Sequence, residues 1–71
     1  MQKRIIAQSS LTYAYKGESI LRASGIAVQI VRLAAGQTIG GCGYGLSIFE
    51  TDLNRALGQL RSRGAFIGQI L

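Results

Sequence analysis

The residues best suited to chemistry lie in one short run, the segment Gly-Gly-Cys-Gly-Tyr-Gly from Gly40 to Gly45. Its Cys42 is the only cysteine among the 71 residues. A thiol between residues without side chains is open to an approaching molecule, and it becomes a nucleophile once ionised. Because the chain has no histidine, it lacks the base of a cysteine–histidine hydrolase or transferase. Thiol exchange, or the covalent carriage of a group on Cys42, is the chemistry that remains.

The surroundings of Cys42 could stabilise an ionised thiol. Successive backbone N–H groups in glycine-rich turns form concave anion sites. The candidate frame consists of four glycines: Gly40, Gly41, Gly43 and Gly45. A nearby positive charge favours the thiolate, and Arg32 is the best candidate for it. The alternative is that Cys42 is only a small residue filling a tight turn.

The elements that must position this segment follow from the spacing of apolar residues. Alternation and β-branched residues predict strands, and residues recurring every three or four positions predict helices. The predicted strands are Lys3 to Gln8, Ile26 to Leu33, Tyr44 to Glu50 and Ala65 to Leu71. The predicted helices run from Leu11 to Ser24 and from a cap at Thr51 or Asp52 to Gly64, with the glycine-rich loop from Ala34 to Gly43 between strands two and three.

The order β-α-β-β-α-β predicts an α+β fold of the ferredoxin-like type, in one domain covering residues 1–71. Two helices would cover one face of a four-stranded antiparallel sheet, and the apolar last strand, including Phe66, would pair inside it. The other face would carry Gln29, Val31, Ser47 and Phe49. A half-apolar open face of this kind is a candidate surface for a dimer or another partner.

Composition limits the remaining classes of site and location. One cysteine and three scattered acidic residues, without histidine, lack the ligands of a metal cage, so we expect no metal and no cofactor. The apolar stretches are shorter than the roughly 18–20 residues that span a bilayer, and no export signal is predicted. A lone cysteine then favours the cytoplasm. Because so small a core rarely leaves more than roughly 3–5 kcal/mol, we expect self-association, in the simplest case as a homodimer.

The order of motifs around Cys42 resembles the selenium/sulfur (Se/S) carrier protein-like family over about Ile5 to Ile70. The resemblance rests on Ala23-Ser24-Gly25-Ile26 at the first helix end, on Cys42-Gly43, and on Asp52-Leu53-Asn54-Arg55-Ala56-Leu57 at the second helix start. It implies a small bacterial cytoplasmic protein that holds sulfur or selenium on the cysteine as a persulfide or selenosulfide. A donating enzyme and an acceptor protein would be its partners. The chain itself would not be an enzyme.

Two other functions remain open from the residues. A ferredoxin-like module without chemistry would bind a protein or metabolite, or dimerise, through the open face at Val31 and Phe49. RNA binding is the third function, because eight basic against three acidic residues give a net charge of +5 and such sheets can stack bases on aromatic residues. However, strand one has basic residues without an aromatic, and Phe49 has no basic neighbour on its own strand. Nucleic acid is therefore not expected as a partner, and the glycine-rich run lacks the spacing of a nucleotide-binding loop.

Overall fold

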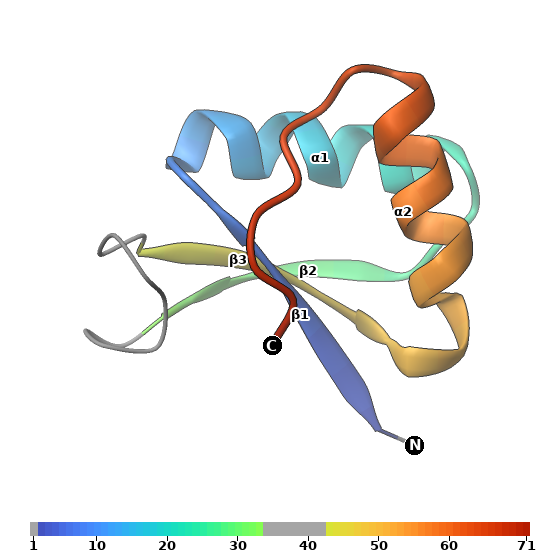
Figure 1. Cartoon of the computed structure of the whole chain (residues 1–71), viewed down its shortest axis with the longest axis horizontal. Helices are drawn as coiled ribbons and strands as arrows, with labels where there is room; N and C mark the ends of the chain where they lie inside the picture. Colours follow the sequence, from blue (N-terminus) through green and yellow to red (C-terminus); the bar gives the residue numbers. More distant parts are fainter. Residues whose placement is uncertain (1, 34–42) are drawn as a thin grey trace.

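Three strands and two α-helices make up the described part of the chain, residues 2–33 and 43–71, in the computed structural model (Figure 1). In chain order they are β1 (Lys3–Gln8), α1 (Leu11–Ala23), β2 (Val28–Arg32), β3 (Tyr44–Phe49), a short 3₁₀ helix η1 (Glu50–Asp52) and α2 (Leu53–Ser62). The three strands form one antiparallel sheet in the order β1-β3-β2. The predicted α+β class is therefore confirmed. The bounds of these three strands and two helices agree with the bounds predicted from the sequence to within two residues.

Local sequence accounts for the start of α1 and for the C-terminal ends of both helices, whereas the predicted cap of α2 is not formed, because Asp52 before α2 makes no side-chain capping hydrogen bond. Ser10 caps α1, since its Oγ accepts a hydrogen bond from the backbone N–H of Tyr13 at 3.3 Å. Such a cap satisfies one of the N–H groups that the first helical turn leaves without a partner. Gly25 and Gly64 follow the two helices with φ of 77° and 68°. This left-handed conformation commonly ends helices, and glycine adopts it readily because glycine has no Cβ.

Both helices lie on the same side of the sheet and enclose one core (Figure 1). Alternate residues of the strands face the helices, and these meet one stripe from each helix. The buried core residues are Ile6, Ala14, Leu21, Ile26, Val28, Leu46, Ile48, Ala56 and Leu60. The approach of α1 to the sheet is close at Gly17, where an added Cβ would lie 2.6 Å from Cδ1 of Leu46.

The prediction of a fourth strand at Ala65 to Leu71 is wrong, and with it the four-stranded ferredoxin-like sheet. The described residues form a sheet of three strands. Residues 65–71 run beside β1 as irregular chain (Figure 1). Ile5 and Leu71 exchange two backbone hydrogen bonds, of 3.3 and 2.8 Å, and one isolated bridge joins Ile6 to Ile70.

The pairing is interrupted at Ala7, because two consecutive residues of the C-terminal segment oppose it. The N–H of Gly68 donates to the Ala7 carbonyl at 3.1 Å, and the N–H of Ala7 donates to the Gln69 carbonyl at 2.8 Å. Two residues against one make a β-bulge, which disrupts a ladder locally. Phe66 is also not in the core as predicted: it is 40% exposed and stacks on Tyr13 with 5.5 Å between ring centroids.

Candidate functional site

The centre of the predicted thiol site, Gly40, Gly41 and Cys42, lies outside the residues that the structure describes. Gly43, Gly45 and Arg32 are the described members of that prediction. The N–H of Leu33 donates to the Gly43 carbonyl at 2.8 Å. The chain therefore leaves β2 and enters β3 at the same end of the sheet, with Gly43 fixed beside Leu33.

Gly45 and Arg32 have contacts of their own. Gly45 is buried in the central strand, and a Cβ there would lie 2.5 Å from Cγ2 of Ile5 and 3.5 Å from Cδ1 of Leu33. Because Gly45 has no side chain, the side chains of Ile5 and Leu33 can lie over the central strand at this position. Arg32 is exposed, and its guanidinium lies 6.0 Å from the centroid of the Tyr44 ring.

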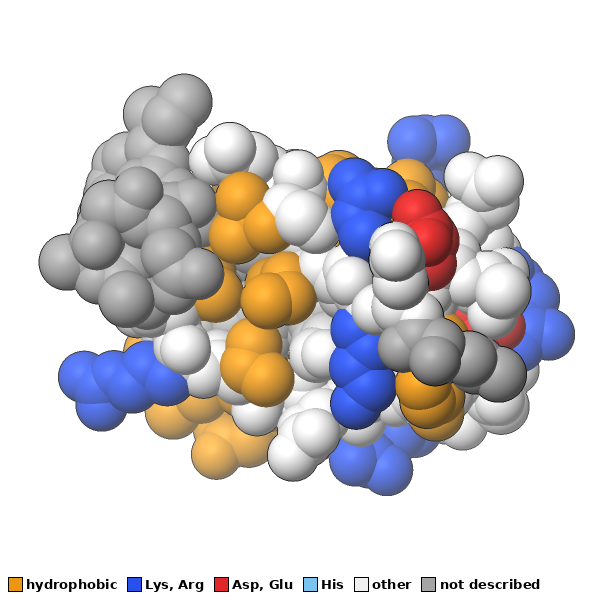
Figure 2. Space-filling model, turned by 90° about the horizontal axis from the view of Figure 1, so that it is seen from below, with side chains coloured by type: hydrophobic (Ala, Val, Ile, Leu, Met, Phe, Trp, Pro, Cys, Tyr) orange, Lys and Arg blue, Asp and Glu red, His pale blue; other side chains and the backbone are white. Residues whose placement is uncertain are grey.

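The sheet face opposite the helices is the second candidate site. We call it the open face and define it by Lys3, Ile5, Ala27, Gln29, Val31, Ser47 and Phe49, which alternate with the core residues along the chain. Hydrophobic side chains gather on this side of the molecule, with lysine and arginine side chains beside them (Figure 2). The four residues predicted for this face, Gln29, Val31, Ser47 and Phe49, all belong to it.

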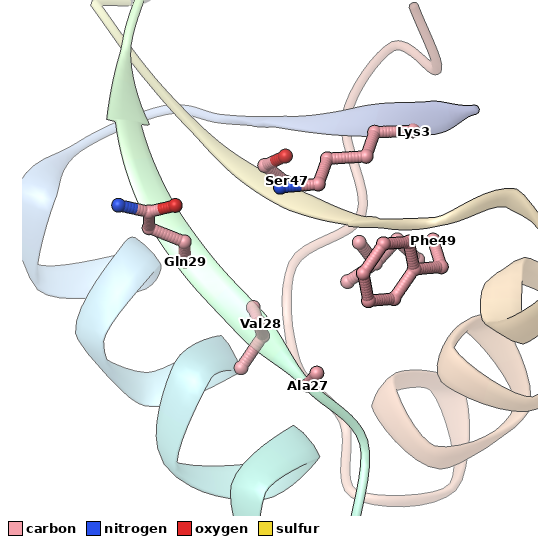
Figure 3. A pocket seen from close by; sticks show the side chains of 7 residues that line it. Lys3, Ala27, Val28, Gln29, Ser47 and Phe49 are labelled. Atoms are coloured by element: carbon pink, nitrogen blue, oxygen red, sulfur yellow. The ribbon is translucent and has the colours of Figure 1, made fainter. Parts of the chain in front are cut away.

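A pocket of about 190 Å³ lies at one end of the open face (Figure 3). Strand register explains its position, because Ser47 is opposite Gln29 on β2 while Phe49 is opposite Lys3 on β1. The small side chains of Ser47 and Ala27 leave space between the larger ones. The pocket is lined by Lys3, Ala27, Val28, Gln29, Ser47, Ile48 and Phe49.

Lys3 brings a positive charge to this pocket. Its Nζ lies 5.3 Å from the centroid of the Phe49 ring, which is a cation–π distance. The sequence prediction separated the basic residues of strand one from Phe49 of strand three, and it missed both this pair and Ala27. Alternation along strand three could place Phe49 on the open face, but its pairing with Lys3 depends on the register of β1 against β3.

All three acidic side chains of the chain are paired with arginine. The pairs join Arg4 to Glu50 at 3.4 Å, Arg22 to Glu18 at 3.4 Å and Arg55 to Asp52 at 3.6 Å. The net charge of +5 therefore resides on the five remaining cations: Lys3, Lys16, Arg32, Arg61 and Arg63. Within the described residues, no carboxylate side chain neutralises the Lys3 ammonium.

Residues 2–33 and 43–71 bring together no group of three or more side chains that could hold a metal ion. No helix in the same ranges has the length and apolar character of a membrane span. Comparison of the chain with protein-family models, curated proteins and solved structures gave no match. The resemblance to the selenium/sulfur carrier protein-like family therefore stays a prediction.

Proposed function

We propose that this chain is a small cytoplasmic carrier protein that holds sulfur or selenium on Cys42. The observation that carries the proposal is the composition of the site: one cysteine, framed by glycines, in a chain without histidine. A carrier needs an accessible thiol, and it must lack a second internal thiol that would discharge the bound atom as a disulfide. Cys42 meets the second requirement by composition, and its glycine neighbours support the first.

Loading would proceed by thiol exchange and needs no external oxidant. The Cys42 thiolate attacks the outer sulfur of a persulfide on a donor enzyme, and the S–S bond of the donor breaks as the new S–S bond forms. The donor cysteine leaves as a thiolate, and Cys42 becomes the persulfide. With selenium as the outer atom, the same exchange gives a selenosulfide. Attack by an acceptor thiol on the outer atom returns Cys42 to the thiolate.

Gly43 is the described residue next to the proposed thiol. This residue follows Cys42 in the sequence and is hydrogen-bonded to Leu33 just before the central strand begins. The open face belongs to the same sheet and offers a surface on which a donor or acceptor protein could dock. Since the net charge is +5 and every acidic side chain is paired, an acidic partner would be attracted over a distance.

Intact mass spectrometry tests the proposal. Wild type and Cys42→Ser are incubated with a cysteine desulfurase and cysteine, and their masses are measured before and after reduction. We expect wild type to gain one or more sulfur atoms that a reductant removes, and Cys42→Ser to gain none. Equal behaviour of the two proteins, with the thiol shown to be reduced and the desulfurase active, would contradict the proposal.

A second candidate is a non-catalytic module that acts through the open face, for which homodimerisation is the simplest case. The observation in its favour is that the open face carries the apolar side chains of Ile5, Val31 and Phe49, while both helices lie on the opposite face of the sheet (Figure 1). Sedimentation of wild type and Val31→Glu separates this candidate from the carrier. A dimer that the substitution dissociates supports the module, and a wild-type monomer at high concentration contradicts dimerisation.

A further inference from the structure

We infer that the pocket at Lys3, Ser47 and Phe49 is a binding site for a small organic carboxylate with a flat apolar body. This site is separate from Cys42, and its function does not depend on the carrier proposal. It combines three kinds of group that such a ligand needs: a positive charge, an aromatic surface and uncharged hydrogen-bond donors. All of them belong to described residues on the sheet (Figure 3).

The positive charge is the Lys3 ammonium. Its three N–H donors face no carboxylate side chain in the described residues, because the three acidic residues pair with Arg4, Arg22 and Arg55. The side chain reaches over the sheet toward Ser47 (Figure 3), and Nζ lies 5.3 Å from the Phe49 ring centroid. A bound carboxylate would accept a charge-assisted hydrogen bond from Nζ, which is about twice as strong as a neutral one.

The aromatic surface is the Phe49 ring, with the Ala27 methyl group just before β2 beside it. Flat ligands gain most from an offset or edge-on contact with such a ring. The pocket volume of about 190 Å³ is large enough for a six-membered ring and a small polar group, since a cavity of about 150 Å³ is known to hold benzene. The size and lining therefore favour a ligand close to benzoate in shape.

The uncharged donors are the Ser47 hydroxyl and the Gln29 amide, which stand opposite each other in the register of β2 and β3. Both line the pocket. Neither side chain is used in a hydrogen bond within the described structure, in contrast to Ser10, Ser24 and Ser62. The Ser47 hydroxyl lies near the end of the Lys3 side chain, whereas the Gln29 amide nitrogen points away from it (Figure 3). A carboxylate held by Lys3 would therefore accept a hydrogen bond from Ser47 directly and from Gln29 after its terminal amide turns. These bonds would fix the ligand's orientation over Phe49.

The binding test is a titration of the ¹⁵N-labelled full chain with sodium benzoate, followed by amide chemical shifts at constant ionic strength. We expect weak but saturable shifts concentrated at the pocket residues. Benzyl alcohol, which keeps the ring but lacks the charge, should bind more weakly. Because the pocket is open to solvent, the charge should change the dissociation constant by only about fivefold, as for an exposed ion pair worth about 1 kcal/mol.

Two matched lysine variants separate the site from general attraction of anions. Lys3→Met and Lys16→Met each remove one positive charge, but Lys16 is an exposed residue of α1 and does not line the pocket. We expect Lys3→Met to weaken benzoate binding about fivefold, with Lys16→Met close to wild type. In a third variant, Ala27→Leu, a larger side chain fills the pocket. Because Ala27 is exposed and lies outside the core, this substitution should remove saturable binding and leave the core intact.

Three results would overturn the inference. One is the absence of saturation with benzoate, and another is equal binding of benzoate and benzyl alcohol. The third is an equal effect of Lys3→Met and Lys16→Met, which would assign the binding to net charge alone. Amide dispersion in the same spectra shows whether each variant is folded. If Lys3→Met is unfolded, Ala27→Leu decides the matter, and saturable binding that survives this substitution would equally overturn the inference.

Discussion

Replacing Gly17 by alanine tests how closely α1 packs on the sheet. Two effects of opposite sign compete at this position. Alanine is favoured over glycine in a helix interior by about 0.5–1 kcal/mol. However, the new Cβ would lie 2.6 Å from Cδ1 of Leu46, a side chain with 0% exposure in the centre of the core. Overpacking of this kind costs about 1–3 kcal/mol.

Gly58 in α2 is the matched control. It is exposed, and an added Cβ there meets nothing within 4 Å. Gly58→Ala should therefore show the helix preference alone and stabilise the fold by about 0.5–1 kcal/mol. For Gly17→Ala, the sum of the two effects gives a free energy of unfolding from about that of wild type to roughly 2.5 kcal/mol below it.

Urea unfolding followed by circular dichroism measures both variants against wild type. The expected gap between them is about 1–3 kcal/mol, which corresponds to about 4–8 °C in Tm for each kcal/mol in a domain of this size. Equal m-values would show that the unfolded states are comparable. Equal stabilisation by both substitutions would refute the packing of α1 against Leu46.

Three further substitutions test other contacts. Ser10→Ala removes the acceptor for the Tyr13 N–H and should cost about 1 kcal/mol in urea unfolding; no loss would contradict the cap. Gly68→Ala places a Cβ against the Ala7 carbonyl, so hydrogen exchange at the Ala7 amide should accelerate, and unchanged protection would contradict the bulge. Leu21→Ala empties a fully buried site and should cost about 2–5 kcal/mol, enough to unfold much of the protein; a cooperative transition near that of wild type would contradict its place in the core.

The elements predicted correctly from the sequence are those set by local chemistry. Gly25 and Gly64 end their helices because the left-handed conformation there is a property of one residue. The residues of β2 and β3 that alternate with the predicted open face, among them Val28, Leu46 and Ile48, face the core as expected, because burial acts on each element separately. These patterns were enough to establish the α+β class.

The features that the sequence did not predict depend on how distant segments meet. Residues 65–71 have the mostly apolar composition of a buried strand, but the β-bulge opposite Ala7 breaks their pairing with β1. Phe66 stacks on Tyr13 at the surface instead of entering the core. The Lys3–Phe49 pair follows from the register of β1 against β3, which the pattern of either strand alone leaves open.

A transfer experiment tests whether Cys42 carries a sulfur or selenium atom between two other thiols. The purified protein is loaded with labelled sulfur from a cysteine desulfurase, the donor is removed, and a thiol acceptor is added while peptide masses are followed over time. We expect the label to appear on the peptide containing Cys42 and then to move to the acceptor at the rate at which it leaves that peptide. Label that never reaches Cys42, or that stays there when the acceptor is added, would contradict the carrier function.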